Sequence, residues 1–94
     1  MRVNLEFFGL SRLVVGKKEI ALDLEENATF RDVVRKLAAM YPDLIGNVIR
    51  PDGESLQHPN IFNRNAKQMI RADQMDERPS DGDRIILMSM SAGG

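Results

Sequence analysis

The sequence contains no cysteine and a single histidine. The missing thiol excludes disulfides, thiol catalysis and thiolate metal sites, and it is compatible with a reducing cytosol. We therefore expect a cytoplasmic protein. The histidine, His58, lies in the loop-like segment Gln57-His58-Pro59-Asn60. A lone loop histidine is far more often solvated than catalytic, so we assign it no chemical role.

Charge of one sign and long hydrophobic runs are also missing. Thirteen basic and fourteen acidic residues give a net charge of −1, which offers no electrostatic case for binding nucleic acid. The longest apolar run falls far short of the ~20 residues that cross a bilayer, and charges interrupt the N-terminal hydrophobic residues as they would not in a signal peptide. No nucleophile–base pair, carboxylate dyad or phosphate loop can be assembled. We expect no catalytic residue, metal or bound cofactor in this chain.

The N-terminal third predicts an antiparallel hairpin. A chain of this length forms one domain with a modest core. Apolar and polar residues alternate over 2–8, with Val3, Leu5 and Phe7 on one face, and again over 20–25. Both segments are typical of half-buried strands. We expect residues 9–18 to be a long connecting loop, in which 13–15 could extend either strand.

One amphipathic helix is predicted next. Thr29 is a good N-cap, and Asp32 three residues later approximates a capping box. Pro42 ends the helix after Tyr41. Arg31, Arg35 and Lys36 are expected to form its solvated face. Its apolar stripe consists of Phe30, Val33, Val34, Leu37, Ala38 and Tyr41.

The second half reads as short strands separated by irregular segments. Residues 44–49 are apolar and are expected to pack as a helical turn or minor strand, because a long structureless loop is unusual in a compact domain. Strands are predicted at 60–64, at 69–71 and, after an Asp81-Gly82 turn, at 85–88. One helix covering one face of such a sheet makes an α+β domain over residues 1–90.

The chain then ends in small residues and two glycines, and we expect 91–94 to be a flexible tail. A terminal carboxylate is ionised at neutral pH and could attack the α-phosphate of ATP to form an acyl-adenylate. Residues without a Cβ can enter a narrow channel where others clash. A frayed terminus that ends in glycine by chance is the alternative.

This arrangement resembles the ubiquitin-like β-grasp sulfur carriers, in particular the small subunit of molybdopterin synthase and its relatives in thiamine and cysteine biosynthesis. The likeness rests on the opening strand, the helix start at 29–33, the Phe62-Asn63 pair, and Asp81-Gly82-Asp83 leading to Gly93-Gly94. It implies a mixed sheet of four to five strands packed on one main helix.

The resemblance also implies a function. Gly94, preceded by Gly93, would be adenylated by an E1-like enzyme that uses ATP, and would become a thiocarboxylate for cofactor or metabolite synthesis, most closely a molybdopterin-type pathway. A large synthase subunit is a possible further partner. The alternative is a protein modifier conjugated through Gly94 to lysines, as in the archaeal small modifiers. A non-covalent β-grasp binding module is a third hypothesis.

The last strand offers a surface for such partners. Alternation places Ile85 and Leu87 on one face, and we expect the helix to cover them. The opposite face would then be exposed. If the strand were central and buried on both faces, this surface would be lost. The predicted partner-binding residues are Phe8, Ile86, Met88, Met90, Ser91 and Ala92.

Overall fold

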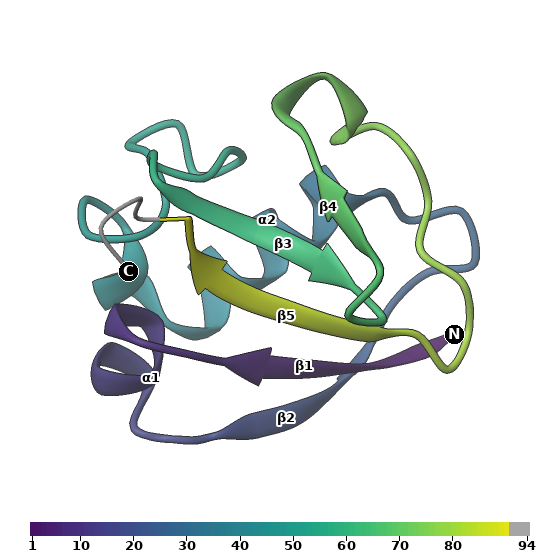
Figure 1. Cartoon of the computed structure of the whole chain (residues 1–94), viewed down its shortest axis with the longest axis horizontal. Coiled ribbons are helices and arrows are strands. Elements are labelled where there is room, and N and C mark those ends of the chain that lie inside the picture. The colour runs from purple at the N-terminus through teal and green to yellow at the C-terminus, as the bar shows by residue number, and fades with distance from the viewer. Residues whose placement is uncertain (91–94) are drawn as a thin grey trace.

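The structure is a computed structural model that describes residues 1–90, which form a mixed sheet with its main helix across one face (Figure 1). The strand order is β2-β1-β5-β3-β4. The α+β prediction of four to five strands on one main helix is confirmed. The strands are β1 (Arg2–Phe7), β2 (Glu19–Asp23), β3 (Asn60–Arg64), β4 (Gln68–Ile70) and β5 (Arg84–Ser89), and the main helix is α2 (Phe30–Met40).

The centre of the sheet is the parallel pair β1 and β5. β1 also pairs with β2 in the predicted antiparallel hairpin, and β3 is antiparallel to both β5 and β4. In the parallel ladder Asn4 lies opposite Arg84 and Phe7 opposite Leu87. The segments that follow these two strands therefore leave the sheet at the same edge.

The core lies between α2 and the sheet, as the periodicities predict. Val3, Leu5 and Phe7 of β1 are buried, and Phe30 of α2 packs against Phe62 of β3 with ring centroids 6.2 Å apart. Burying one large apolar side chain contributes about 1.5–3 kcal/mol. Four of the helical stripe positions are fully buried, and Ala38 and Tyr41 pack against the core more loosely; the four are Phe30, Val33, Val34 and Leu37.

The predicted helix start is confirmed. The Thr29 hydroxyl accepts a hydrogen bond from the Asp32 amide at 3.2 Å, and the Asp32 carboxylate accepts one from the Thr29 amide at 2.9 Å. The predicted solvated face is confirmed at Arg35 and Lys36, which are exposed, but not at Arg31. Arg31 pairs with Asp76 at 2.9 Å and is half-buried, because the segment after β4 folds over the start of α2.

Three of the connecting segments contain helical structure. Residues 9–18 hold a short helix, α1 (Leu10–Val15), between Gly9 and Gly16, which both have positive φ. The expectation of a loop or strand extension there is wrong, because a buried Ser11 and a glycine at each end define a helix too short to show a period. Short 3-10 turns, η1 (Pro42–Leu44) and η2 (Ala72–Gln74), occupy the other irregular segments. Residues 44–49 pack as predicted, with Leu44, Val48 and Ile49 buried.

Candidate functional site

The strand that leads to the C-terminus begins at a tight turn. The Asp83 amide donates to the Ser80 carbonyl at 3.0 Å, and Gly82 takes a φ of 85°, which favours glycine. The Asp81 carboxylate accepts a hydrogen bond from the Arg2 amide at 2.8 Å. The predicted Asp-Gly turn is confirmed, and it ties the start of β5 to the start of β1.

Asp83 anchors this turn from inside. Asp83 is 8% exposed, and its carboxylate accepts hydrogen bonds from the Ser80 amide at 2.7 Å, Arg64 Nε at 2.8 Å and Asn65 Nδ2 at 3.0 Å. Burial would raise the pKa of Asp83, but these hydrogen bonds and the Arg64 charge outweigh it and hold the pKa below its usual value. The charged Asp83 therefore fixes the direction of β5.

The far end of β5 is held on both sides. Beyond the ladder, the Phe8 amide donates to the Leu87 carbonyl at 3.0 Å, and the Met90 amide donates to the Pro59 carbonyl at 2.8 Å. The predicted activated residues Gly93 and Gly94, and the predicted partner residues Ser91 and Ala92, lie outside the described residues. The structure therefore describes the end of β5 and Met90, the base after which these residues follow in the sequence.

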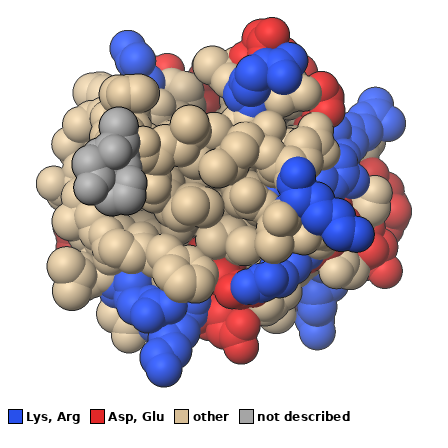
Figure 2. Space-filling model, in the orientation of Figure 1, with Lys and Arg blue, Asp and Glu red and all other residues tan. Residues whose placement is uncertain are grey.

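An apolar pocket of about 360 Å³ lies beside this base, on the sheet face opposite α2. We call it the Phe8 pocket; its lining consists of Phe8, Gly9, Ile86, Met88 and Ser89. Phe8 is 42% exposed and Met88 is half-buried. Figure 2 shows this face: uncharged side chains cover its middle, and charged side chains gather around its margin. The structure thus brings three of the predicted partner residues together, namely Phe8, Ile86 and Met88.

The prediction that Ile86 is exposed is wrong. Its side chain is 7% exposed, because β5 is central and the neighbouring Glu6 and Asn63 stand beside Ile86 in register. Glu6 is itself held over the sheet by an ion pair with Arg84. Ile86 therefore forms the floor of the Phe8 pocket, and Phe8 and Met88 form its accessible walls.

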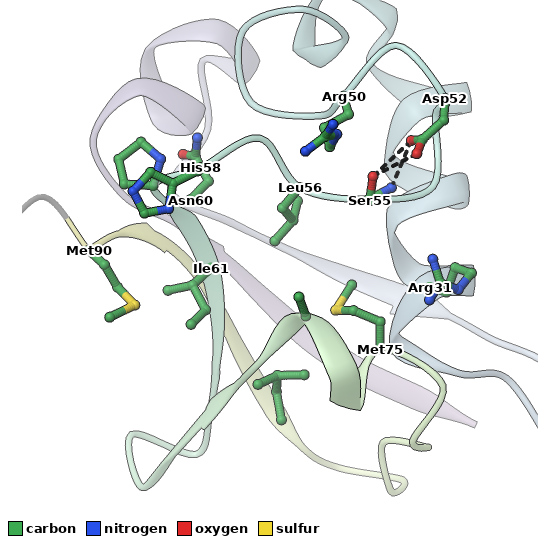
Figure 3. A pocket seen from close by; sticks show the side chains of 13 residues that line it. Arg31, Arg50, Asp52, Ser55, Leu56, His58, Asn60, Ile61, Met75 and Met90 are labelled. Atoms are coloured by element: carbon green, nitrogen blue, oxygen red, sulfur yellow. Dashed lines mark hydrogen bonds between the residues drawn. The ribbon is translucent and has the colours of Figure 1, made fainter.

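Met90 is exposed as predicted, but it does not line the Phe8 pocket. It lies beyond the end of β5 and lines a second pocket of about 440 Å³ at the 50–60 loop. In Figure 3 its side chain points toward Ile61, while Arg50 and His58 stand on the loop side of the pocket. The hydrogen bond to Pro59 draws the chain toward this loop, so strict alternation fails at Met90.

Sequence reasoning missed α1 as a neighbour of this site. The Ser11 hydroxyl is buried 2.9 Å from the Phe8 carbonyl and 3.4 Å from the Leu87 carbonyl. The available signal was the Gly9…Gly16 spacing around a segment that includes the good helix formers Leu10, Arg12 and Leu13. Within residues 1–90, no group of three or more acidic or histidine side chains is placed to hold a metal ion. The same residues contain no helix with the length and hydrophobicity to cross a membrane.

Comparison with solved structures defines the class of fold. The chain matches SAMP1 of Haloferax volcanii with a TM-score of 0.81 at 24% identity, over the whole of both chains. It matches a putative molybdopterin converting factor, subunit 1, of Pyrococcus furiosus with a TM-score of 0.71 at 20% identity, covering 94% of this chain and 95% of the other. These likenesses show a ubiquitin-like β-grasp fold, as the sequence resemblance predicted.

Comparison of sequences identifies the family to which the chain belongs. Small archaeal modifier protein 3 of Haloferax volcanii is 37% identical over 94 residues, which span all of both chains. Small archaeal modifier protein 1 of the same organism is 30% identical over 81 residues, covering 86% of this chain and 87% of that protein. No protein-family model matches. The chain belongs to the family of small archaeal modifier proteins.

Proposed function

We propose that this protein is a carrier whose C-terminal carboxylate, on Gly94, is activated by an E1-like enzyme. A carboxylate oxygen would attack the α-phosphorus of ATP, pyrophosphate would leave, and an acyl-adenylate would form. The activating enzyme would hold the ATP, and this chain would contribute no catalytic residue. The observation that carries the proposal is the position of the central strand β5, which is fixed at both ends and is followed in sequence, after three residues, by Gly93-Gly94.

The Phe8 pocket is the proposed recognition surface for that enzyme. It lies beside the end of β5, and its walls are apolar side chains on an otherwise polar-rimmed face. Exposed apolar clusters commonly mark partner sites, and methionine adapts to more than one partner. Met90, Ser91 and Ala92, which precede Gly93-Gly94 in the sequence, would then make further contacts with the enzyme.

Two fates of the adenylate are supported by different observations. In the first, a lysine amine of a target protein displaces AMP and forms an isopeptide bond. This fate is favoured by 37% identity, over the whole chain, to a protein named as a small archaeal modifier. We propose conjugation as the first of the two functions, because this relative matches the sequence as well as the fold.

In the second fate, hydrosulfide attacks the acyl carbon, AMP leaves with the electron pair of the C–O bond, a proton is lost, and Gly94 becomes a thiocarboxylate for cofactor or metabolite synthesis. The fold shared with a putative molybdopterin converting factor subunit supports this fate. A molybdopterin-type pathway would then supply a large synthase subunit as a second partner. Both fates begin with ATP, and neither depends on a disulfide. Because ATP and a reducing environment are found together in the cytoplasm, we propose that the protein works there.

Mass spectrometry of protein from the source cells tests the two fates. The last basic residue is Arg84, so trypsin would leave the segment 85–94 attached to any modified lysine. Target peptides carrying this remnant would support conjugation. An intact mass raised by one oxygen-to-sulfur exchange would support sulfur transfer. A chain with an unmodified terminus and no remnant on any target, in cells that express it well, would contradict both.

A further inference from the structure

The short helix α1 presents two leucine side chains to solvent. Leu13 is 81% exposed and Leu10 is 47% exposed, whereas the buried residue of this helix is a serine, Ser11. Val14 and Val15 pack partly against the core. Core packing therefore does not explain why positions 10 and 13 are leucine. A partner that covers these side chains would explain it.

The parallel pairing of β1 and β5 places α1 at the edge where the chain continues toward its C-terminus (Figure 1). Ser11 and Phe8 fix α1 against the Leu87 carbonyl. Residues 91–94 can span at most about 14 Å, at roughly 3.5 Å per residue. An enzyme whose active site reaches Gly94 must therefore cover the surface around the end of β5, which includes α1.

The charge around these leucines has one sign. Residues 8–18 include Arg12, Lys17 and Lys18 and contain no acidic residue. The Arg12 guanidinium lies 4.7 Å from the Phe8 ring centroid, and the exposed Lys17 and Lys18 make no ion pair within residues 1–90.

The nearest carboxylates in sequence are already engaged. Glu6 pairs with Arg84, and Glu19 accepts a hydrogen bond from Asn4 at 3.1 Å. Arg12 lies within electrostatic reach of Glu6, but the positive charge of Lys17 and Lys18 is in no ion pair within residues 1–90. An acidic surface is its electrostatic complement.

We propose that the α1 face, defined as Phe8, Leu10, Leu13, Lys17 and Lys18, docks on an acidic surface of the activating enzyme that has an apolar recess for Leu13. This inference rests on the proposed function and adds a second contact to the Phe8 pocket. Leu13 supplies an apolar anchor, and the lysines speed association and make it sensitive to salt.

Binding of the fluorescently labelled chain to the cognate adenylating enzyme, without ATP, tests this proposal. Leu13→Gln should weaken binding about tenfold, and Lys17→Glu with Lys18→Glu should weaken it and flatten its salt dependence. Two controls lie on or before β4, away from α1. Met69→Gln matches Leu13→Gln, and Lys67→Glu reverses one charge, as each of the single variants Lys17→Glu and Lys18→Glu does; both controls should leave the Kd within about twofold. Leu13, Lys17 and Lys18 are exposed, and unchanged melting curves would show that the variants fold.

The outcomes separate this proposal from the proposed function. If Leu13→Gln and the lysine variant bind as well as the wild type, or if the wild type does not bind, the α1 proposal is wrong. Leu13-dependent binding to phosphatidylglycerol vesicles with unchanged enzyme affinity would also overturn it. ATP–pyrophosphate exchange that persists after Gly94 is deleted would instead overturn the proposed function, whatever the Kd values.

Discussion

The backbone amide of Phe8 donates a hydrogen bond to the carbonyl oxygen of Leu87 at 3.0 Å, one residue beyond the last pair of the β1–β5 ladder. This contact fixes the start of α1 beside the end of β5. It also places the Phe8 ring at the Phe8 pocket, next to Met88. The accessible side chains of Phe8 and Met88 and the path to the C-terminus therefore meet at one end of the central strands.

If the Phe8 pocket is the recognition surface, a substitution in its wall should weaken binding to the activating enzyme without slowing adenylation. Met88→Gln would place an amide against apolar partner surface, at a cost of about 1–3 kcal/mol. The half-saturating concentration of the chain in ATP–pyrophosphate exchange with its enzyme should rise about tenfold, and the maximal rate should stay unchanged. Met69→Gln, on the edge strand β4, is the matched control. Equal effects of both substitutions would count against the pocket as a recognition surface.

We expect Ala66→Gly, in the turn between β3 and β4, to stabilise the chain. Asn65 and Ala66 both have positive φ, 56° and 59°, and the Lys67 amide donates to the Arg64 carbonyl at 3.0 Å. Alanine is strained in this conformation, and glycine is preferred at the second position of such a turn. Ala66→Gly should raise the free energy of unfolding in urea by about 0.5–1 kcal/mol.

The same chemical change in a helix supplies the control. Ala39 is exposed in α2, where glycine costs about 1 kcal/mol relative to alanine. Ala39→Gly should therefore lower the free energy of unfolding. If both substitutions destabilise the chain, Ala66 is not strained.

We expect the contribution of Asp83 to the free energy of unfolding to be lost in acid. Because its pKa is lower in the folded chain, its contribution is present above the unfolded value of about 3.9 and is lost as pH falls through the folded value. Asp83→Asn should lower the free energy of unfolding by about 1–3 kcal/mol at pH 7, since the partly buried Arg64 loses its charged partner.

The pH dependence separates this role from simple packing. The difference between wild type and Asp83→Asn should shrink below about pH 4, because the wild-type carboxyl is then protonated in the unfolded chain. Urea unfolding at several pH values measures it. A difference that stays constant from pH 7 to pH 3 would show that the charge on Asp83 contributes nothing.

Elements with a clear period could be predicted from sequence. The capping residues Thr29 and Asp32 and the apolar stripe defined α2, and the alternation at Val3, Leu5 and Phe7 defined β1. Local chemistry was sufficient there, because each pattern spans enough residues to distinguish a helix from a strand. The same is true of the Asp81-Gly82 turn.

Other features depend on tertiary contacts that no local pattern encodes. α1 is only six residues long, and its position depends on the hydrogen bond from Ser11 to the Leu87 carbonyl, which is far away in sequence. The burial of Ile86 depends on its neighbours across β1 and β3. Met90 leaves the strand alternation because its amide binds Pro59. The sequence therefore predicted that Phe8 and Met88 lie together on the open face, but not that Met90 lines a different pocket, and the role of these residues in binding a partner stays a prediction.

The most direct test of the account is acyl-adenylate formation on Gly94. The cognate activating enzyme, ATP and labelled pyrophosphate would be mixed with the wild-type chain, with a chain lacking Gly94, and with a chain carrying one added alanine. The account predicts exchange with the wild type and loss of exchange with both altered termini, although all three chains should unfold at the same urea concentration. Exchange at the wild-type rate with the extended chain would contradict it.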